Sequence, residues 1–227
     1  ATHRKKFDIP VIGVTGSNGK TTVKEWLYQL LQPDYNTVRS PRSYNSQIGV
    51  PLSVWQIGSK TEMAIFEAGI SQPDEMIHLE EIIKPTLGLI TNIGEAHQEG
   101  FQTIQQKCIE KLTLLKACDC IIYDGDNELI CECVEKLCFG CREIAWSRKD
   151  RDKPLYISKI IKGNDSTKIE YTYLQYHSYI TIPFVEDASI ENALNCLAAC
   201  LYLMMPADQI TERMVRLEPV AMRLEVK

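Results

Sequence analysis

The chain has 227 residues, of which 44% are hydrophobic and 24% are charged, which is enough for one sizeable hydrophobic core. Its net charge of −5 and the lack of a basic stripe argue against binding to nucleic acid. The uncharged run over residues 192–207 is too short and too polar to span a bilayer, and the N-terminal residues show no signal-peptide pattern. We therefore expect a soluble, cytoplasmic monomer that binds neither nucleic acid nor membrane.

A glycine-rich loop lies close to the N-terminus. The apolar run Ile9–Val14 predicts a strand, and the amphipathic run after residue 22 predicts a helix, with GVTGSNGKTT over residues 13–22 between them. This layout is typical of a phosphate-binding loop, in which Lys20 reaches the outer phosphates and the Thr21 hydroxyl ligates Mg²⁺. The usual glycine spacing is broken by Val14, and an ordinary glycine turn before a helix is the alternative.

Strand-like and helical runs then alternate along the chain. Strands are expected over residues 35–39, 63–66, 87–90, 120–123 and 144–146. Helices are expected over residues 45–57, 71–84, 103–116, 127–137, 189–205 and 208–217, and Thr103 and Gln106 predict a capping box. Three strand-like runs follow Pro154, over residues 155–161, 168–174 and 179–183. We predict an α/β fold with a P-loop-type, mostly parallel sheet, helices on both faces and a small antiparallel sheet packed beside it.

Polar residues follow two of the expected strands. Because the carboxyl ends of parallel strands meet at one edge of a sheet, these residues are expected near the glycine-rich loop. Glu67 follows the strand over residues 63–66 and is a candidate Mg²⁺ ligand, whereas a solvated acid at a strand end is the alternative. His97 lies in the loop after residue 90, where it is a candidate functional residue or a surface histidine.

Lys111 has an unusual position on the helix expected over residues 103–116. The apolar stripe of that helix consists of Ile104, Cys108, Leu112 and Leu115. At 100° per residue Lys111 falls within this stripe, where burial favours loss of its proton. A neutral lysine amine can react with CO₂ to form a carbamate, an anion whose oxygens suit Mg²⁺. A lysine that extends along the stripe to solvent is the alternative.

Two asparagines interrupt the apolar helix expected over residues 189–205. Asn192 and Asn195 lie three residues apart and therefore share a face. Buried amides require hydrogen-bond partners, so they either bond to the backbone near the first turn or contact an adenine edge.

The nine cysteines are expected to be reduced and mostly buried. Cys138 and Cys141 have the spacing of a zinc-binding pair, but a second pair with that spacing is missing. We favour buried, apolar cysteines over a zinc site.

Together these motifs match a known family. The loop over residues 13–22, including its valine at position 14, resembles the ATP loop of the Mur ligases of peptidoglycan synthesis. Further motifs in the family's order are FEAG at 66–69, TNIGEAH at 91–97 and ENALN at 191–195. SYNSQIGVPL at 43–52 and HQEGF at 97–101 are similar to the MurF-type branch, which joins D-alanyl-D-alanine to UDP-N-acetylmuramoyl-tripeptide. The resemblance covers nearly the whole chain.

The resemblance implies a domain organisation. Mur ligases have a domain for the UDP-sugar, a central ATPase domain and a C-terminal domain for the incoming amine. PVAMRLE at 219–225 is similar to the family's junction after the central domain, so residues 1–227 are expected to form that single central domain, excised from a longer chain. Two departures are Glu191, where the family has histidine, and Met222, where it has glycine.

Roles for individual residues follow from the same resemblance. It implies that Lys20, Lys111 and His97 are catalytic and that Asn45 binds substrate. The residues implied to bind ATP are Gly16, Ser17, Asn18, Gly19, Lys20, Thr21, Thr22, Asn192, Asn195 and Arg223. The residues implied to hold Mg²⁺ are Thr21, Glu67, His97 and, once carbamylated, Lys111.

The implied reaction is ATP-driven amide formation. Transfer of the γ-phosphate to the tripeptide carboxylate gives an acyl phosphate, which the amine of D-alanyl-D-alanine then attacks. The alternatives are a folate polyglutamate or cyanophycin type of synthetase, or a nucleotide-binding module without ligase activity in isolation.

Overall fold

The computed structural model describes residues 2–94 and 100–220. The strands are β1 (Val11–Thr15), β2 (Thr37–Arg39), β3 (Met63–Glu67), β4 (Leu87–Ile90), β5 (Cys120–Asp124), β6 (Arg142–Ser147), β7 (Leu155–Lys162), β8 (Thr167–Tyr173) and β9 (Tyr176–Ile182). The α-helices are α1 (Lys20–Leu31), α2 (Gly49–Val54), α3 (Glu75–Ile83), α4 (Ile104–Leu112), α5 (Glu128–Leu137), α6 (Asp187–Tyr202) and α7 (Ala207–Met214). Short 3₁₀ turns occupy Arg4–Lys6 and Thr113–Leu115.

All nine strands belong to one sheet, in the order β2-β3-β1-β4-β5-β6-β7-β8-β9. The strands from β2 to β6 are parallel, and the predicted α/β fold class is confirmed. The antiparallel strands β7 to β9 continue this sheet instead of packing beside it, because Trp146 and Ser147 pair in parallel with Leu155 and Tyr156. The chain order reverses around β1, which lies between β3 and β4, and such a switch point is where open α/β sheets bind ligands.

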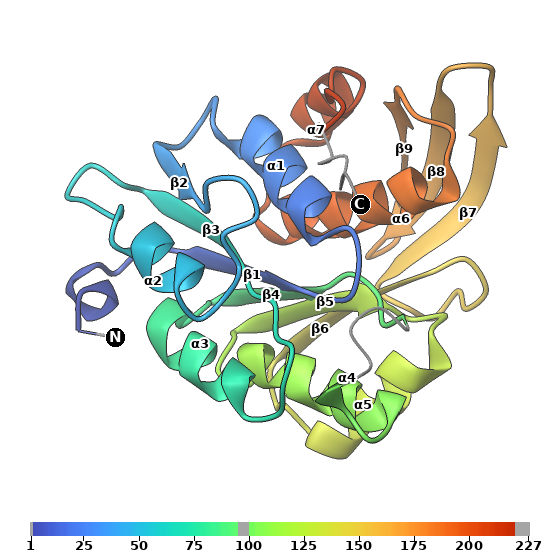
Figure 1. The fold of residues 1–227 in the computed structure, drawn as a ribbon. Coiled ribbons are helices and arrows are strands. Elements are labelled where there is room, and N and C mark those ends of the chain that lie inside the picture. Colours follow the sequence, from blue (N-terminus) through green and yellow to red (C-terminus); the bar gives the residue numbers. More distant parts are fainter. Residues whose placement is uncertain (1, 95–99, 221–227) are drawn as a thin grey trace, which may run out of the picture.

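Helices cover both faces of the sheet (Figure 1). Helices α1, α6 and α7 lie on one face, and α2, α3, α4 and α5 lie on the other. Ile65 and Phe66 are neighbours in β3 but belong to opposite cores, as the two-residue period of a strand requires. Burying a side chain of this size stabilises the fold by about 1.5–3 kcal/mol.

Several expected boundaries differ in the structure; for example, the helix expected over residues 71–84 begins only at Glu75. Two of the differences have a local explanation. Helix α2 begins at Gly49 instead of residue 45, because residues 43–46 form a turn in which the Asn45 N–H bonds to Ser43 O at 2.9 Å. Strand β9 begins at Tyr176, earlier than expected, because Leu174 and Gln175 make the tight turn from β8 with φ of 46° and 75°. Neither residue is one that two-residue hairpin turns favour, so the sequence carries no signal for this turn.

The capping box at the start of α4 is confirmed. The Gln106 N–H donates to the Thr103 hydroxyl oxygen at 3.0 Å, and the Gln106 side-chain oxygen accepts from the Gln102 N–H at 2.9 Å. These bonds satisfy one backbone donor before the helix and one in its first turn, and they fix where α4 begins.

The cysteines are mostly buried, as expected. The buried ones are Cys108, Cys118, Cys120, Cys133, Cys196 and Cys200. The expectation fails for Cys138, which is exposed because it ends α5 with φ of 45°. Residues 2–94 and 100–220 contain no group of three or more His, Cys, Asp or Glu side chains that could hold a metal ion.

In the described part of the chain, every helix is too short or too polar to cross a membrane.

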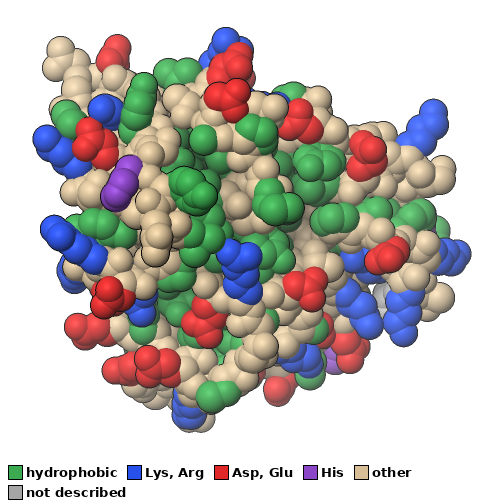
Figure 2. All heavy atoms as spheres, turned by 180° about the vertical axis from the view of Figure 1, so that it is seen from behind, with side chains coloured by type: hydrophobic (Ala, Val, Ile, Leu, Met, Phe, Trp, Pro, Cys, Tyr) green, Lys and Arg blue, Asp and Glu red, His purple; other side chains and the backbone are tan. Residues whose placement is uncertain are grey.

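Figure 2 shows the face behind the view of Figure 1, where hydrophobic side chains gather along the middle of the surface. Lysine and arginine side chains are interspersed with acidic ones around this band, so this face carries no continuous basic stripe.

Candidate functional site

The glycine-rich loop connects β1 to α1 and has a backbone that only glycine adopts easily. Gly16 has φ of 134° and Gly19 has φ of 79°. A Cβ at Gly16 would lie 2.0 Å from the Thr91 hydroxyl oxygen, and one at Gly19 would lie 2.2 Å from Asn192 Oδ1. Both glycines are therefore required by conformation and by space, and the loop leaves its backbone close to the N-terminus of α1.

The residues after β4 hold this loop in place. The Thr91 hydroxyl donates to Asn18 O at 2.5 Å, and the N–H groups of Ser17 and Asn18 donate to the backbone and side-chain oxygens of Asn92. The Ser17 hydroxyl also accepts from the Gly94 N–H at 2.9 Å. Asn18 itself is exposed, and Thr22 lies in the first turn of α1, half-buried. The loop is thus fixed before any ligand binds.

Three lysines converge beside the loop. Lys20 Nζ donates to Gly16 O at 2.9 Å and to Ser17 O at 3.0 Å, and Lys111 Nζ donates to Gly16 O at 3.2 Å. Lys107, one turn before Lys111, donates to Gly94 O. Lys111 is 3% exposed, so the alternative of a lysine that extends to solvent is wrong.

Burial and the closeness of other ammonium groups lower the pKa values of these lysines. Burial, together with the ammonium groups of Lys20 and Lys107, lowers the pKa of Lys111 to about 7. Burial also lowers the pKa of Lys20, while Glu67 opposes the change. An amine with a pKa near 7 is largely neutral at pH 8, and the neutral form is the one that reacts with CO₂.

Glu67 is a buried carboxylate whose second oxygen is unpaired. Pairing of β3 with β1 sets Glu67 opposite Val14, at the start of the loop. It is fully buried, so the alternative of a solvated acid is wrong. Oε1 accepts from Asn45 Nδ2 at 3.3 Å, whereas Oε2 has no hydrogen-bond partner in residues 2–94 and 100–220. Burial raises the pKa of Glu67, and Lys24, the Thr21 hydroxyl and Lys20 oppose that rise.

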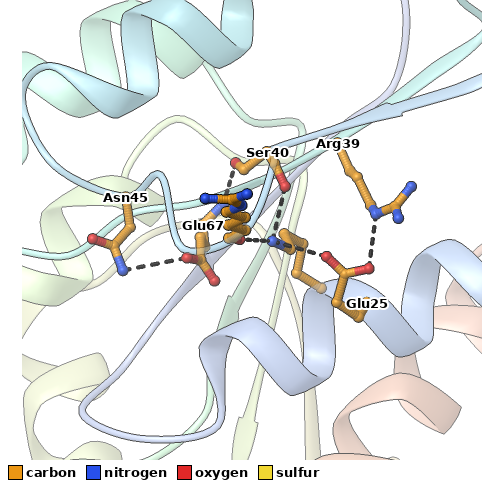
Figure 3. Close-up of polar contacts among 7 residues, drawn as sticks. Glu25, Arg39, Ser40, Asn45 and Glu67 are labelled. Carbon is orange, nitrogen blue, oxygen red and sulfur yellow. Dashed lines mark hydrogen bonds and ion pairs between the residues drawn. The ribbon is translucent and has the colours of Figure 1, made fainter. Parts of the chain in front are cut away.

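A network of buried polar groups supports Glu67 from the side of α1 (Figure 3). The Ser40 hydroxyl accepts from the Glu67 N–H at 3.3 Å, and Ser40 O accepts from Lys24 Nζ at 2.8 Å. Lys24 is fully buried and forms an ion pair of 3.1 Å with Glu25, which in turn binds Arg39 at 2.8 Å. Lys24 therefore ties the segment after β2 to α1, and the Ser40 hydroxyl ties the same segment to the strand that ends in Glu67.

The two asparagines of α6 have different surroundings. Asn195 is fully buried, accepts from Trp146 Nε1 at 3.1 Å and donates to Glu191 O at 3.1 Å. Asn192 points its side chain at Gly19, where the loop meets α1. Helix α6 has its N-cap at Glu186, so neither asparagine caps it. A role for either in ATP binding stays a prediction.

Acidic and basic groups also lie beyond Asn192, where β5 and β6 end. The Asp126 carboxylate accepts from the Ser147 hydroxyl at 2.5 Å and from the Arg148 N–H at 2.8 Å. Burial raises the pKa of Asp124 to about 6, and the carboxylates of Asp126 and Glu191 add to that rise.

The structure brings most of the predicted residues together. Lys20, Thr21, Glu67 and Lys111 surround the loop, and Asn45 contacts Glu67. His97 and Arg223 lie outside the described residues, and their predicted roles stay predictions.

Sequence reasoning missed Lys24 and Lys107, although the signal that singled out Lys111 also applies to them. Lys24 lies three residues before Leu27 on the apolar face of α1, and Lys107 lies three after Ile104 on that of α4. Each is therefore a charged residue on a buried stripe.

These features define a class of protein: an α/β domain with a phosphate-type loop, a buried carboxylate and three lysines at the carboxyl edge of a parallel sheet. Residues 14–200 match the Mur ligase middle domain, and the chain belongs to the Mur ligase family. The resemblance seen in the sequence motifs is thus confirmed.

Within the Mur ligase family, this chain is similar to ligases that carry the same name in different bacteria. The UDP-N-acetylmuramoyl-tripeptide--D-alanyl-D-alanine ligase of Borreliella burgdorferi is 32% identical over 221 residues, which are 93% of this chain and 45% of that protein. The enzyme of the same name from Bacillus subtilis is 28% identical over 219 residues, 95% of this chain and 46% of that protein. The chain spans about half the length of these curated relatives.

Solved structures agree on the fold. MurF from Acinetobacter baumannii has a TM-score of 0.87 at 22% identity, over 96% of this chain and 48% of that one. MurF ligase from Thermotoga maritima in complex with ADP has a TM-score of 0.84 at 23% identity, over 96% of this chain and 51% of that one.

Proposed function

We propose that this chain is the ATP-binding central domain of a ligase that joins D-alanyl-D-alanine to UDP-N-acetylmuramoyl-tripeptide. The observation that carries the proposal is the buried Glu67 carboxylate, with one unpaired oxygen, beside Thr21 and Lys20 at the phosphate-type loop. The named relatives from Borreliella burgdorferi and Bacillus subtilis support the choice of substrates. Such a ligase would act in the cytoplasm as a monomer, with the UDP-substrate domain and the amine-substrate domain supplied by the rest of a longer chain.

The residues present fit ATP and Mg²⁺. The missing Cβ atoms at Gly16 and Gly19 let Thr91 and Asn192 pack against the loop. The loop leads into the N-terminus of α1, whose partial positive charge suits phosphate oxygens. The unpaired Glu67 oxygen and the Thr21 hydroxyl are hard oxygen donors of the kind that Mg²⁺ prefers. When bound, the ion offsets the negative charge on the phosphates and the substrate carboxylate.

In this proposal the chain's own residues position and shield the reacting groups. Lys20 leaves its carbonyl partners Gly16 O and Ser17 O to bind the terminal phosphate. Lys111, held against Gly16 and largely neutral above pH 7, would add to CO₂ with loss of a proton, and the resulting carbamate would offer Mg²⁺ a further oxygen ligand. Asn45 keeps Glu67 oriented while it contacts the substrate.

Lys20→Ala in the intact ligase tests the proposal. We expect acyl-phosphate formation and ligation to fall by at least ~100-fold, because the variant loses the cation that stabilises charge on the transferred phosphate. Product is measured with UDP-N-acetylmuramoyl-tripeptide, D-alanyl-D-alanine and ATP, and the exposed Lys149→Ala is the matched control. Full activity of Lys20→Ala would refute the proposal.

A second test uses the wild-type enzyme with other substrates. Activity with folate and glutamate, or with cyanophycin precursors, in place of these substrates would instead favour the other ligase types.

A further inference from the structure

Arg148 follows β6 directly and has buried donors without partners. Its Nε and one terminal nitrogen are buried and have no hydrogen-bond partner in the described ranges 2–94 and 100–220. The nearest carboxylate, Glu191, lies 3.9 Å from the terminal nitrogen, which is too long for a hydrogen bond. Because a buried donor without an acceptor is costly, this guanidinium is placed to accept a ligand that supplies one.

The position of Arg148 relates it to the phosphate-type loop. Glu191 and Asn192 are adjacent in α6, and Asn192 faces Gly19 at the end of the loop. Arg148 therefore lies beside the neighbour of Asn192 in α6, at the carboxyl end of β6. A nucleotide whose phosphates occupy the loop would extend its nucleoside in this direction.

The charges around Arg148 indicate which chemical group it binds. The carboxylates of Asp126 and Glu191 lie beside it, and Asp124 lies just behind them. Three carboxylates would repel a phosphate group at this point. They do not oppose a neutral ring or sugar, and their oxygens can accept from ribose hydroxyls or an exocyclic amine.

The shape of the guanidinium suits the same group. It lies 5.8 Å from the centre of the Trp146 ring, and the Trp146 N–H is anchored to Asn195. A planar guanidinium can stack on a purine ring while its edge donates to ring nitrogens or ribose oxygens.

We propose that Arg148 binds the nucleoside part of the nucleotide, its Nε and terminal nitrogen donating to base or ribose acceptors while Glu191 accepts from the opposite side. This inference rests on the proposed function, since it takes the loop to hold the phosphates. It assigns to Arg148 and Glu191 the recognition of the nucleoside, distinct from the phosphate contacts of Lys20.

Calorimetric titration of this chain with ATP and with inorganic tripolyphosphate, both with Mg²⁺, tests the inference. Arg148→Ala is expected to weaken ATP binding about tenfold and to leave tripolyphosphate binding within about twofold of wild type, because charged hydrogen bonds to the nucleoside are lost. Arg148→Lys, which keeps the charge but loses the planar fork, is expected to weaken ATP binding nearly as much. Thermal unfolding of each variant verifies that the fold is kept.

The control and the outcomes separate the two proposals. Arg151→Ala removes an equal charge three residues away, where Arg151 is exposed over Tyr156, and is expected to bind both ligands like wild type. Equal losses for ATP and tripolyphosphate, or no loss for ATP, would overturn the inference about Arg148 and leave the proposed function standing. If the wild-type chain binds neither ligand, the proposed function fails and this inference fails with it.

Discussion

The two ends of the site, one at the phosphate-type loop and one at Arg148, differ in how deeply their charged side chains are buried. At the phosphate end, Lys20, Lys24, Glu67, Lys107 and Lys111 converge, and of these Lys24 and Glu67 are fully buried. At the other end, which we propose binds the nucleoside and call the nucleoside end, Arg148 and Glu191 have side chains that are 34% and 40% exposed. Within residues 2–94 and 100–220, both ends contain a group without a hydrogen-bond partner, Glu67 Oε2 in one and the Arg148 donors in the other.

The two ends differ in how far their charged side chains are exposed to solvent, and this exposure determines how much a substitution is expected to change stability. Water screens the pair of Arg148 and Glu191, and such pairs contribute little to stability. Lys24 and Glu67 are shielded from water, so water cannot solvate either charge when its partner is removed. Their charged forms are therefore stabilised by each other and by their hydrogen bonds. The phosphate end is thus part of the folded core, whereas the nucleoside end can change with little effect on the fold.

Lys24→Ala tests this contrast most strongly. We expect the free energy of unfolding to fall by about 3 kcal/mol, because Ser40 O and the Glu25 carboxylate lose a buried cation. Urea denaturation measures the change. Arg148→Ala, at the nucleoside end, is expected to shift the same quantity by less than about 0.5 kcal/mol. Similar losses for both variants would contradict the contrast between the two ends.

Glu67→Gln has the next largest expected effect. The amide keeps the volume of the side chain and a carbonyl oxygen for Asn45, but it removes the negative charge offered to Mg²⁺. We expect ATP affinity in the presence of Mg²⁺ to fall about 30-fold, or about 2 kcal/mol, and affinity without Mg²⁺ to change little.

Titration calorimetry with and without Mg²⁺ measures the effect of Glu67→Gln, with the exposed Glu81→Gln as the control. Loss of affinity under both conditions would mean that Glu67 supports the loop and does not bind the ion.

The fold and the phosphate end could be predicted largely from the sequence. Buried parallel strands are continuous apolar runs, and a carboxylate or lysine within such a run or stripe, as with Glu67 and Lys111, is visible without coordinates. The same rule would have found Lys24 and Lys107. Arg148 could not be found in this way, because it lies in a loop, and only the packing of α6 on β6 shows that Glu191 faces it.

Asn45 illustrates the other limit of sequence reasoning. A helix was expected to begin at this residue, yet a turn places it before α2, where its amide reaches Glu67. Tertiary contacts of this kind override local helix propensity, and a periodic pattern does not contain them.

Per pH unit, the dependence of stability on pH is the smallest of the expected effects, and it separates the two ends by sign. The folded pKa of Lys111, about 7, lies below its ordinary value of 10.5, so the unfolded chain binds more protons between these values and stability rises with pH there. The folded pKa of Asp124, about 6, lies above its ordinary value of 3.8, so the folded chain binds more protons between these values and stability falls as pH rises from 4 to 6. Each slope is expected to be at most ~1.4 kcal/mol per pH unit, the value for a difference of one bound proton. Urea denaturation at several pH values should show that Lys111→Met removes the rise above pH 7 and Asp124→Asn removes the fall below pH 6.

One outcome would contradict the neutral state of Lys111. A Lys111→Met profile that still follows wild type between pH 7 and pH 9 would mean that Lys111 keeps its proton, and the carbamate would then have no neutral amine from which to form.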